Sequence, residues 1–358
     1  MLFESYNLGA TALANRTVMA PMTRSRTTHN SAPDMLVAKY YEQRATAGLI
    51  VTEGTSPSPN GIGYARIPGL YNEEQVKGWR LTVDAVHKVG GKVFVQLMHT
   101  GRVGHLDNLP VGARVVGPSP EVCPGEMWTD KAGQQPHTAP VTMTESDILQ
   151  TIQEYSTAAK LAMKAGFDGI ELHAANGYLM EQFLNPNVNK RTDGYGGRSE
   201  ARNRFTLEVA QACVKAIGAD KVGIRISPYG VFNGTGEFEG VDEQFLALTS
   251  RLSDMGLVYL HLVDHSAMGA PPVPAEFKKK LRDAFARTFI AVGGFDAQSA
   301  EKALQAKAAD LIAFGRPFIS NPDLVARMKT GAAISAPDMG TFYTPGEKGY
   351  TDYPPLAV

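Results

Sequence analysis

Cysteine is scarce in this sequence, with Cys123 and Cys213 as the only 2 among 358 residues. They lie far apart in the chain and form no CxxC pair or Cys/His cluster. This excludes a cysteine-ligated iron–sulfur centre and a structural zinc site, and we expect no bound metal. Any redox chemistry would therefore use an organic cofactor.

Long apolar runs are also missing. No stretch reaches the roughly 18 consecutive apolar residues that a membrane-spanning helix needs. The opening MLFESYNLGATALANR lacks the basic region, apolar run and small-residue cleavage site of a secretion signal. We therefore expect a cytoplasmic protein that does not bind membranes.

Neither sign of charge is in excess. Lys and Arg number 35 and Asp and Glu 36, a formal net charge of -1 that argues against nucleic acid or an anionic surface as partner. With 43% hydrophobic residues, 36 glycines and 22 prolines, the composition is that of an ordinary globular protein. We expect residues 1–358 to form one domain that binds small molecules, as a monomer or a homodimer.

Eight short apolar runs each end in a polar or glycine-rich turn and are followed by an amphipathic helical pattern. The runs are RTVMAPM, LIVTEG, KVFVQLMH, FDGIELH, KVGIRISP, VYLHLVD, TFIAVGGF and LIAFGRP. Short, continuous apolar strands of this kind are covered on both faces, as in parallel sheets. Eight cycles of strand and helix predict a closed (β/α)8 barrel, the TIM-barrel fold, rather than an open sheet.

One connection departs from the bare barrel. Residues 100–144, after the third strand, are rich in Pro and Gly and far exceed the usual length of a strand-to-helix loop. Loops that follow barrel strands lie at the catalytic end of the fold. We expect this insertion to act as a lid or pocket wall.

Strand alternation aims three polar side chains at the barrel mouth. Gln96, Arg225 and His173 each occupy the face of a strand opposite its apolar residues, and Glu171 shares the face of His173. One reading is that these groups satisfy one another inside the barrel. Because a barrel gains little from burying several such groups without a ligand, their convergence favours a bound ligand.

The seventh and eighth strands end in turns suited to an anion. Gly293 and Gly294 form the first turn, and Gly315 with Arg316 forms the second. Exposed backbone N–H groups and a guanidinium at this place in a barrel commonly hold phosphate. Glycines that merely relieve tight turns are the alternative for either loop alone. Together the turns predict a phosphorylated cofactor or substrate.

The stretch ELHAANGYLMEQFLNP presents an imidazole, an amide and a phenol at the end of the fourth strand. These groups belong to His173, Asn176 and Tyr178. Asn-Gly is also a common turn dipeptide, so a turn without chemistry is the alternative for this stretch taken alone. Its position beside Gln96 and Arg225 favours a catalytic role.

Several motifs in matching order show that the chain resembles the old yellow enzymes, which are FMN-dependent ene-reductases. They are NRTVMAPMTRSR, VQLMHTGR, ELHAANGYLMEQFLNP with RTDGYGGRSEARNRF, GIRISP, AFGRPFISNPDL and FYTPGEKGYTDYP. The resemblance covers essentially the whole chain and is strongest to the bacterial branch of N-ethylmaleimide, pentaerythritol tetranitrate and glycerol trinitrate reductases. It implies tightly bound, non-covalent FMN, NADPH or NADH as reductant, and activated alkenes such as enones, maleimides and nitroalkenes as oxidants.

The resemblance also implies which residues contact the cofactor. The family's FMN-binding positions fall on Ala20, Pro21, Met22, Thr23, Gly54, Gln96, His173, Arg225, Gly293, Gly294, Gly315 and Arg316. Thr23 would donate to a flavin carbonyl, and Gln96 would pair with the pyrimidine edge as donor and acceptor. Arg225 would lie where negative charge accumulates on reduction.

For the reaction itself, the resemblance implies that His173 and Asn176 donate hydrogen bonds to the oxygen of a carbonyl or nitro group. Polarised in this way, the alkene accepts hydride at its β-carbon from reduced FMN. Tyr178 would then give a proton to the α-carbon. Reduction of nitrate esters or nitro compounds is a further expectation for this branch.

Three other positions match substrate contacts of the family. Tyr64 and Tyr343 are expected to line the substrate pocket, although either would also suit a surface loop. Met98 departs from the pattern, because relatives usually carry Trp two residues after the glutamine. A smaller, flexible side chain there predicts a roomier pocket and altered facial selectivity.

Three other functions fit the same residues less well. A phosphate-binding aldolase or isomerase would need an inward Lys or a pair of carboxylates, which the strand ends do not supply. A dienoyl-CoA-type reductase needs an iron–sulfur cluster that two cysteines cannot build. A flavin-binding sensor without turnover would have no use for a proton donor beside a polarising pair.

Overall fold

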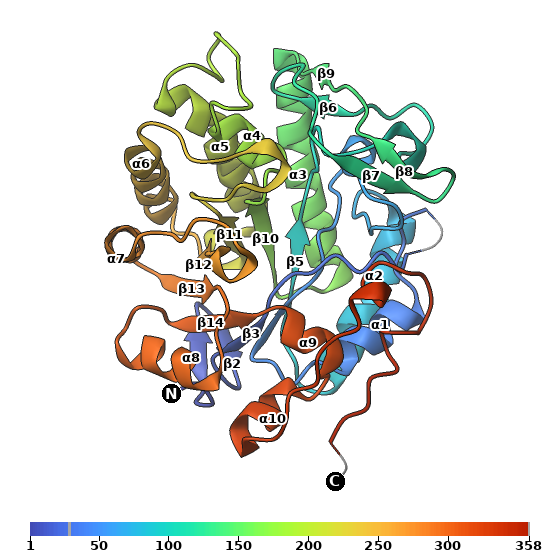
Figure 1. The fold of residues 1–358 in the computed structure, drawn as a ribbon, viewed down its shortest axis with the longest axis vertical. Helices are drawn as coiled ribbons and strands as arrows, with labels where there is room; N and C mark the ends of the chain where they lie inside the picture. The colour runs from blue at the N-terminus through green and yellow to red at the C-terminus, as the bar shows by residue number, and fades with distance from the viewer. Residues whose placement is uncertain (28–29, 357–358) are drawn as a thin grey trace.

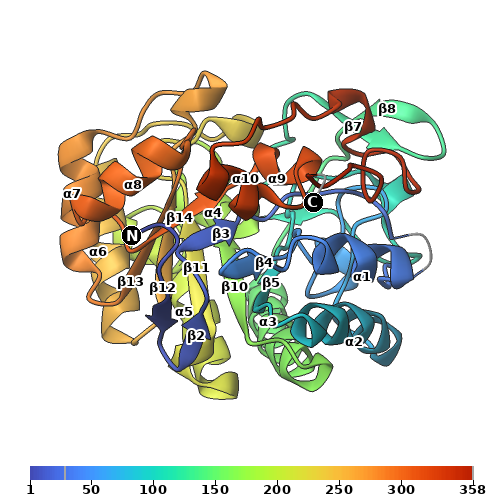
Figure 2. The same cartoon turned by 90° about the horizontal axis from the view of Figure 1, so that it is seen from below.

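The computed structural model describes residues 1–27 and 30–356, and its centre is a closed barrel of eight parallel strands (Figures 1 and 2). The barrel strands are β3 Thr17–Met19, β4 Leu49–Val51, β5 Val93–Leu97, β10 Gly169–Ala174, β11 Val222–Ile226, β12 Tyr259–Val263, β13 Thr288–Val292 and β14 Leu311–Phe314. Each strand pairs with the next along the chain, and β14 pairs with β3 to close the ring. This confirms the predicted (β/α)8 barrel.

Helices alternate with the strands along the chain and surround the barrel (Figures 1 and 2). They are α1 Met35–Glu42, α2 Glu73–Lys88, α3 Glu145–Ala165, α4 Leu179–Leu184, α5 Ser199–Ile217, α6 Val241–Asp254, α7 Ala275–Ala284, α8 Ala297–Gln305, α9 Arg316–Ser320 and α10 Leu324–Thr330. Short 3-10 turns are η1 Pro59–Gly61, η2 Leu106–Asn108, η3 Ala219–Lys221, η4 Phe232–Gly234, η5 Ser266–Met268 and η6 Met339–Thr341. In the described part of the chain, no helix has the length and apolarity needed to cross a membrane.

Local sequence sets the ends of the longest helix, α3. Thr144 and Asp147 form a capping box at its start, each side chain accepting from the other residue's backbone N–H. Gly166 ends it with a φ of 100°, a conformation that residues with a Cβ rarely adopt. These signals fix where the chain leaves the helix and enters β10.

A short hairpin closes the N-terminal end of the barrel, and the sequence patterns did not predict it. Strands β1 Tyr6–Leu8 and β2 Thr11–Leu13 pair antiparallel. Leu8 and Leu13 pack into one apolar cluster with the barrel-interior side chain of Phe94. Three-residue strands are too short to show a period of two, which is why the hairpin escaped sequence analysis.

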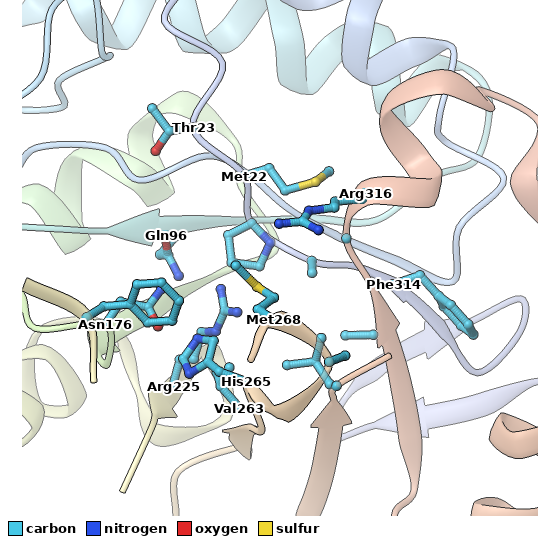
Figure 3. Close-up of a pocket in the computed structure, with 18 of the residues that line it drawn as sticks. Met22, Thr23, Gln96, Asn176, Arg225, Val263, His265, Met268, Phe314 and Arg316 are labelled. Atoms are coloured by element: carbon cyan, nitrogen blue, oxygen red, sulfur yellow. The ribbon is translucent and has the colours of Figure 1, made fainter. Parts of the chain in front are cut away.

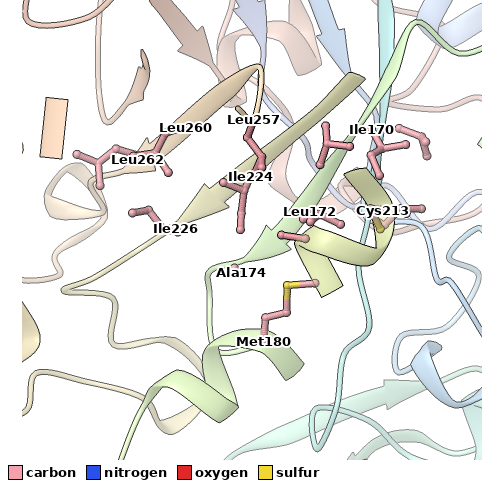
Figure 4. Packing of buried hydrophobic residues seen from close by; sticks show 14 of the residues in the cluster. Ile170, Leu172, Ala174, Met180, Cys213, Ile224, Ile226, Leu257, Leu260 and Leu262 are labelled. Carbon is pink, nitrogen blue, oxygen red and sulfur yellow. The ribbon is translucent and has the colours of Figure 1, made fainter. Parts of the chain in front are cut away.

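The barrel separates apolar from polar side chains by strand alternation. Ile170, Leu172 and Ala174 of β10 face outward and pack with neighbours from β11, β12 and the helices (Figure 4). Inside, the rings of Phe94 and Tyr259 lie 5.8 Å apart and fill the lower part of the barrel. The inward positions above them carry the polar groups of the site.

The segment of residues 341–351 is fixed by three buried arginines, Arg24, Arg26 and Arg44. Arg24 donates through Nη2 to the carbonyl of Gly349 at 2.8 Å, and Arg44 donates to that of Tyr350 at 3.3 Å. Arg26 donates to carbonyls of residues 341, 342, 346 and 348. A guanidinium with five donors suits this task, and the result is a fixed position for the residues that follow α10 at the barrel mouth.

Replacing Gly223 with Ala should lower the stability of the barrel. A Cβ there would lie 2.2 Å from the Tyr259 ring, so the ring or the strand would have to move. Overpacking of this kind costs about 1–3 kcal/mol, which a lower melting temperature would show. Gly117→Ala is the matched control, because its nearest neighbour would be at an ordinary 3.4 Å. Equal melting temperatures for the two variants would contradict this account.

Candidate active site

A cavity of about 760 Å³ opens at the carboxyl ends of the barrel strands (Figure 3). All but one of the residues predicted for the site line it. They are Ala20, Pro21, Met22, Thr23, Tyr64, Gln96, Met98, His173, Asn176, Tyr178, Arg225, Gly293, Gly294, Gly315, Arg316 and Tyr343. All eight barrel strands, or the connections that follow them, contribute to the lining of the cavity.

Gly54 is the exception and does not line the cavity. A Cβ at Gly54 would lie 2.4 Å from the Met98 sulfur, so the glycine makes room for that side chain. Met98 is itself buried against Ile62 and Ile67 and reaches the cavity. Gly54 therefore lies behind the wall and Met98 forms the surface, and contact of Gly54 with the cofactor stays a prediction.

His173 is a neutral hydrogen-bond donor in this setting. Its Nδ1 accepts from the backbone N–H of Ala175 at 3.2 Å, which assigns the ring proton to Nε2. Burial, with Arg225, His261 and His265 nearby, holds the pKa of His173 well below its ordinary value. The imidazole therefore stays uncharged at neutral pH.

Asn176 occupies a left-handed backbone conformation with a φ of 60°. Its N–H donates to the hydroxyl of Ser227 at 2.9 Å, and its carbonyl accepts from Nδ2 of Asn233 at 2.7 Å. The side-chain Oδ1 is buried with no hydrogen-bond partner in the described residues. Because buried amides are normally paired, this side chain is suited to meet a ligand.

Glu181 holds the loop between His173 and Tyr178 in place. It accepts from the Gly177 N–H at 2.6 Å and from the Ser227 hydroxyl at 3.0 Å. Burial raises the pKa of Glu181 to about 8. Sequence analysis missed this residue, because its partners become visible only once β10 and β11 lie side by side.

Tyr178 and Tyr64 form a hydroxyl pair, with their oxygens 2.9 Å apart. Burial raises the pKa of Tyr178 to about 12 and raises that of Tyr64 well above its ordinary value. Either hydroxyl can be the donor in this pair. With its pKa raised, Tyr178 stays protonated at neutral pH.

Arg225 brings an unpaired positive charge to the cavity. The residue is 7% exposed, and its Nε has no hydrogen-bond partner in the described residues. Figure 3 shows its guanidinium among the side chains around the cavity. A buried, unpartnered guanidinium is costly without a ligand, so this observation fits a cofactor that carries or develops negative charge.

Gln96 is paired within the protein. Its Nε2 donates to Glu171 at 2.8 Å, and Glu171 also contacts Nδ1 of His261 at 2.8 Å. The alternative reading, in which inward polar groups satisfy one another, thus holds for Gln96 and Glu171. The same alternation in VYLHLVD that identified Arg225 would have identified His261.

The two glycine turns lie together at one end of the cavity. Gly293 and Gly294 have φ values of 157° and 68°, and Gly315 precedes α9, whose first residue is Arg316. A Cβ at Gly293 would lie 2.7 Å from the carbonyl of Asp264. Backbone N–H groups and one guanidinium around an open space fit a phosphate.

The insertion of residues 100–144 does not form the expected lid or pocket wall. It contains β6 Val116–Gly117, β7 Glu126–Thr129, β8 Gly133–Pro136 and β9 Val141–Thr142, and all of its residues are described. None of them lines the cavity. Cys123 and Met127 instead pack behind Tyr64 and Tyr178, so the insertion supports the tyrosine pair from outside.

Several cavity residues had no signal in the sequence. They are Phe232, Asn233, Asp264, His265, Ala267, Met268, Met339 and Phe342. Most stand in irregular loops after β11 and β12, where no period reveals which way a side chain points. They surround the mouth of the cavity and add mainly apolar surface there.

Comparison with known proteins agrees with this geometry. Residues 1–334 match the family model described as NADH:flavin oxidoreductase / NADH oxidase family. The chain belongs to that family. A probable flavin mononucleotide-dependent alkene reductase of Leishmania infantum is 39% identical over 355 residues, covering 97% of this chain and 95% of the relative.

Solved structures of the family share the whole fold. Morphinone reductase in complex with tetrahydroNAD superposes with a TM-score of 0.94 at 41% identity, covering 99% of this chain and 98% of that one. The old yellow enzyme homologue from Zymomonas mobilis gives a TM-score of 0.95 at 36% identity, with 99% of both chains covered. The old yellow enzyme-like assignment and the FMN cofactor are thereby confirmed. The chain is an NAD(P)H-dependent flavin oxidoreductase.

Replacing Met98 with Trp should narrow the substrate pocket of this flavin oxidoreductase. Gly54 leaves no room on the other side, so an indole would project into the cavity. We expect kcat/KM for bulky enones to fall about 10-fold or more relative to small ones, with a change in product stereochemistry. Met98→Leu conserves volume and is the control. An unchanged range of substrates in Met98→Trp would contradict the role of Met98.

Proposed function

We propose that the protein reduces the C=C bond of activated alkenes, with enones, maleimides and nitroalkenes as the substrate class. When bound, FMN takes a hydride from NAD(P)H and delivers it to the β-carbon of the alkene. The observation that carries the proposal is a neutral imidazole, an unpartnered amide and a protonated phenol from one loop on one wall of the cavity.

FMN fits the remaining walls by the chemistry of its donors. The glycine turns and Arg316 would hold the phosphate, and the unpaired Arg225 would face the electron-rich pyrimidine edge. Gln96 keeps its Oε1 free, because its Nε2 is engaged by Glu171. Thr23, Ala20, Pro21 and Met22 line the cavity beyond β3 and complete the cradle.

His173 and Asn176 orient and polarise the substrate. The Nε2 proton of His173 and the amide of Asn176 would donate to the carbonyl or nitro oxygen, which gains negative charge as the β-carbon is reduced. Such preorganised donors are each worth about 3 kcal/mol in comparable oxyanion sites. Because His173 is neutral, it donates without competing for a proton.

Tyr178 would then supply a proton to the α-carbon. Its hydroxyl lies 2.9 Å from that of Tyr64, and when Tyr64 is the donor of this pair the hydrogen of Tyr178 is free for the substrate. A phenol with a pKa near 12 is protonated at neutral pH, and it gives up its proton only to a strongly basic, enolate-like carbon. Cys123 and Met127 pack behind the pair and support it from outside the cavity.

Other reactions fit this cavity less well. Among the described residues that line it, none is a lysine, so a Schiff-base aldolase has no nucleophile. Its single carboxylate, Asp264, pairs with Lys278 and accepts from the Ser266 N–H. A sensor without turnover leaves the Tyr178 pair unexplained. Membership of the bacterial branch and reduction of nitrate esters stay predictions.

Tyr178→Phe should separate the two half-reactions. Reduction of the yellow enzyme by NADPH needs no proton donor, so bleaching should keep its wild-type rate. Re-oxidation by 2-cyclohexenone should slow by about 100-fold or more, because the α-carbon loses its acid. Stopped-flow absorbance of bound FMN measures both rates.

Two results would count against the proposed function. Wild-type enzyme that NADPH bleaches but no enone, maleimide or nitroalkene restores is not an alkene reductase. Equal re-oxidation rates in Tyr178→Phe and wild type would remove Tyr178 from the reaction. Tyr343→Phe, which removes an exposed hydroxyl at the cavity mouth, is the matched control for loss of a phenol.

The pH profile of re-oxidation should show neither a Tyr178 titration near pH 10 nor a His173 titration near pH 6.5. Glu181, with its pKa raised to about 8, is the group of this loop that titrates between them. With its pKa raised to about 12, Tyr178 keeps its proton well past pH 10, at which an ordinary tyrosine is half ionised. His173, with its pKa lowered, stays neutral down through pH 6.5. Rate constants for pre-reduced enzyme mixed with an enone between about pH 6.5 and 10 test this. A half-maximal loss near pH 10 would show an ordinary Tyr178.

A further inference from the structure

Glu171 is a buried carboxylate behind the cavity lining, and the reaction above has no use for it. It lies on the inward face of β10 and is fully buried. Its Oε1 accepts from Gln96 of β5 and its Oε2 pairs with Nδ1 of His261 of β12, each at 2.8 Å. One carboxylate thus joins three strands directly beneath the cofactor site.

The carboxylate is ionised and its imidazole partner is neutral. Burial acts to raise the pKa of Glu171, but His261, Arg225 and Gln96 together hold it below its ordinary value. Burial lowers the pKa of His261. The neutral ring donates from Nδ1 to Glu171, and its buried Nε2 has no partner in the described residues.

Arg225 is the positive charge that Glu171 faces inside the barrel. It pairs in register with His261 on one side and His173 on the other, and its guanidinium makes no hydrogen bond with the described residues. Burial lowers the pKa of Arg225 and the charge of Glu171 acts against that shift, while the charge of Arg225 helps to hold the pKa of Glu171 below its ordinary value. Buried charges are little screened, so each alters the field of the other at the cavity.

We propose that Glu171 is a positioning residue that sets the reduction potential of bound FMN, by offsetting part of the Arg225 charge and fixing the amide of Gln96. The inference rests on the cofactor placement given under the proposed function. It assigns a role to a side chain that contacts neither substrate nor cofactor, and that acts through two residues that do.

Reduction changes the charge of bound FMN, and this is where Arg225 and Glu171 would act. A hydride from NAD(P)H brings two electrons and one proton, and NAD(P)+ departs, so the isoalloxazine gains one negative charge. Arg225 stabilises that charge and raises the potential. Glu171 opposes it and keeps the potential lower, which leaves reduced FMN a stronger reductant toward an alkene.

Glu171 also fixes the orientation of the Gln96 side-chain amide. Because Nε2 donates to Glu171, the Oε1 of the amide is turned away from the carboxylate and remains available as an acceptor. Gln96 lines the cavity, so this free acceptor would be available to the pyrimidine edge of a flavin bound there. A carboxylate enforces this orientation, since it accepts and never donates when ionised.

Glu171→Gln tests the charge while keeping the shape. Without the negative charge, the full field of Arg225 acts on reduced FMN, and binding of the reduced relative to the oxidised cofactor should tighten about 10-fold or more. For a two-electron couple, that is an upward shift of about 30 mV in midpoint potential. Equilibration of the FMN-loaded protein with redox dyes of known potential measures the shift.

Glu171→Asp is the matched control, since it disturbs the packing but retains the charge. Its potential should stay near that of wild type. If Glu171→Gln does not fold, His261→Leu serves instead, because loss of the donor favours the protonated carboxyl and should raise the potential in the same direction.

The outcomes separate the two proposals. A protein that binds no FMN would overturn both. The role of Glu171 would be overturned if FMN binds but its midpoint potential does not rise in Glu171→Gln or His261→Leu. It would also be overturned if the midpoint potential rises equally in Glu171→Asp. Either result would leave the proposed alkene reduction standing. Failure of enones to re-oxidise wild type, together with the expected potentials, would overturn only the proposed reaction.

Discussion

Closure of eight parallel strands is the constraint from which the site follows. Every second side chain of a closed barrel points inward, where it must pack, pair with another inward group or reach the mouth. Phe94 and Tyr259 take the first course and fill the lower barrel. Gln96 and Glu171 pair with each other, and Arg225 reaches the mouth of the barrel. The polar groups of the site therefore stand above a floor of two aromatic rings.

The parts of the chain outside the barrel serve to hold its mouth. Arginines 24, 26 and 44 bind main-chain carbonyls rather than carboxylates, so a segment with no regular secondary structure has its buried backbone acceptors satisfied. That segment carries Phe342 and Tyr343 to the rim. The insertion of residues 100–144 acts indirectly, because its Met127 packs against Tyr64 and Tyr178, which line the cavity. The long insertion therefore supports the tyrosine pair and does not form a lid over the cavity.

Local sequence pattern predicted the barrel, the inward polar groups and the glycine turns, and the family resemblance supplied the remaining predicted residues of the cavity lining. The run KVGIRISP contains β11, and its period of two correctly placed Arg225 inside. Contacts between segments distant in sequence were beyond reach: nothing in the sequence pairs Glu181 with Ser227 or puts Gly54 behind Met98. His261 is a different case, since the same alternation identifies it. The resemblance to a family supplied roles that alternation alone left open.

Burial is the largest cause behind the protonation states of Tyr178 and His173, and it shifts their pKa values in opposite directions. Removing water disfavours whichever form is charged, so it raises the pKa of Tyr178 and lowers that of His173. One dry wall thus yields an acid that keeps its proton and a donor that stays neutral. Arg225 cannot become neutral by losing a proton when it is buried, because a guanidinium remains charged in proteins. Its charge must be met by a partner, and Glu171 from below and an electron-rich cofactor from above are the two partners that the barrel can offer.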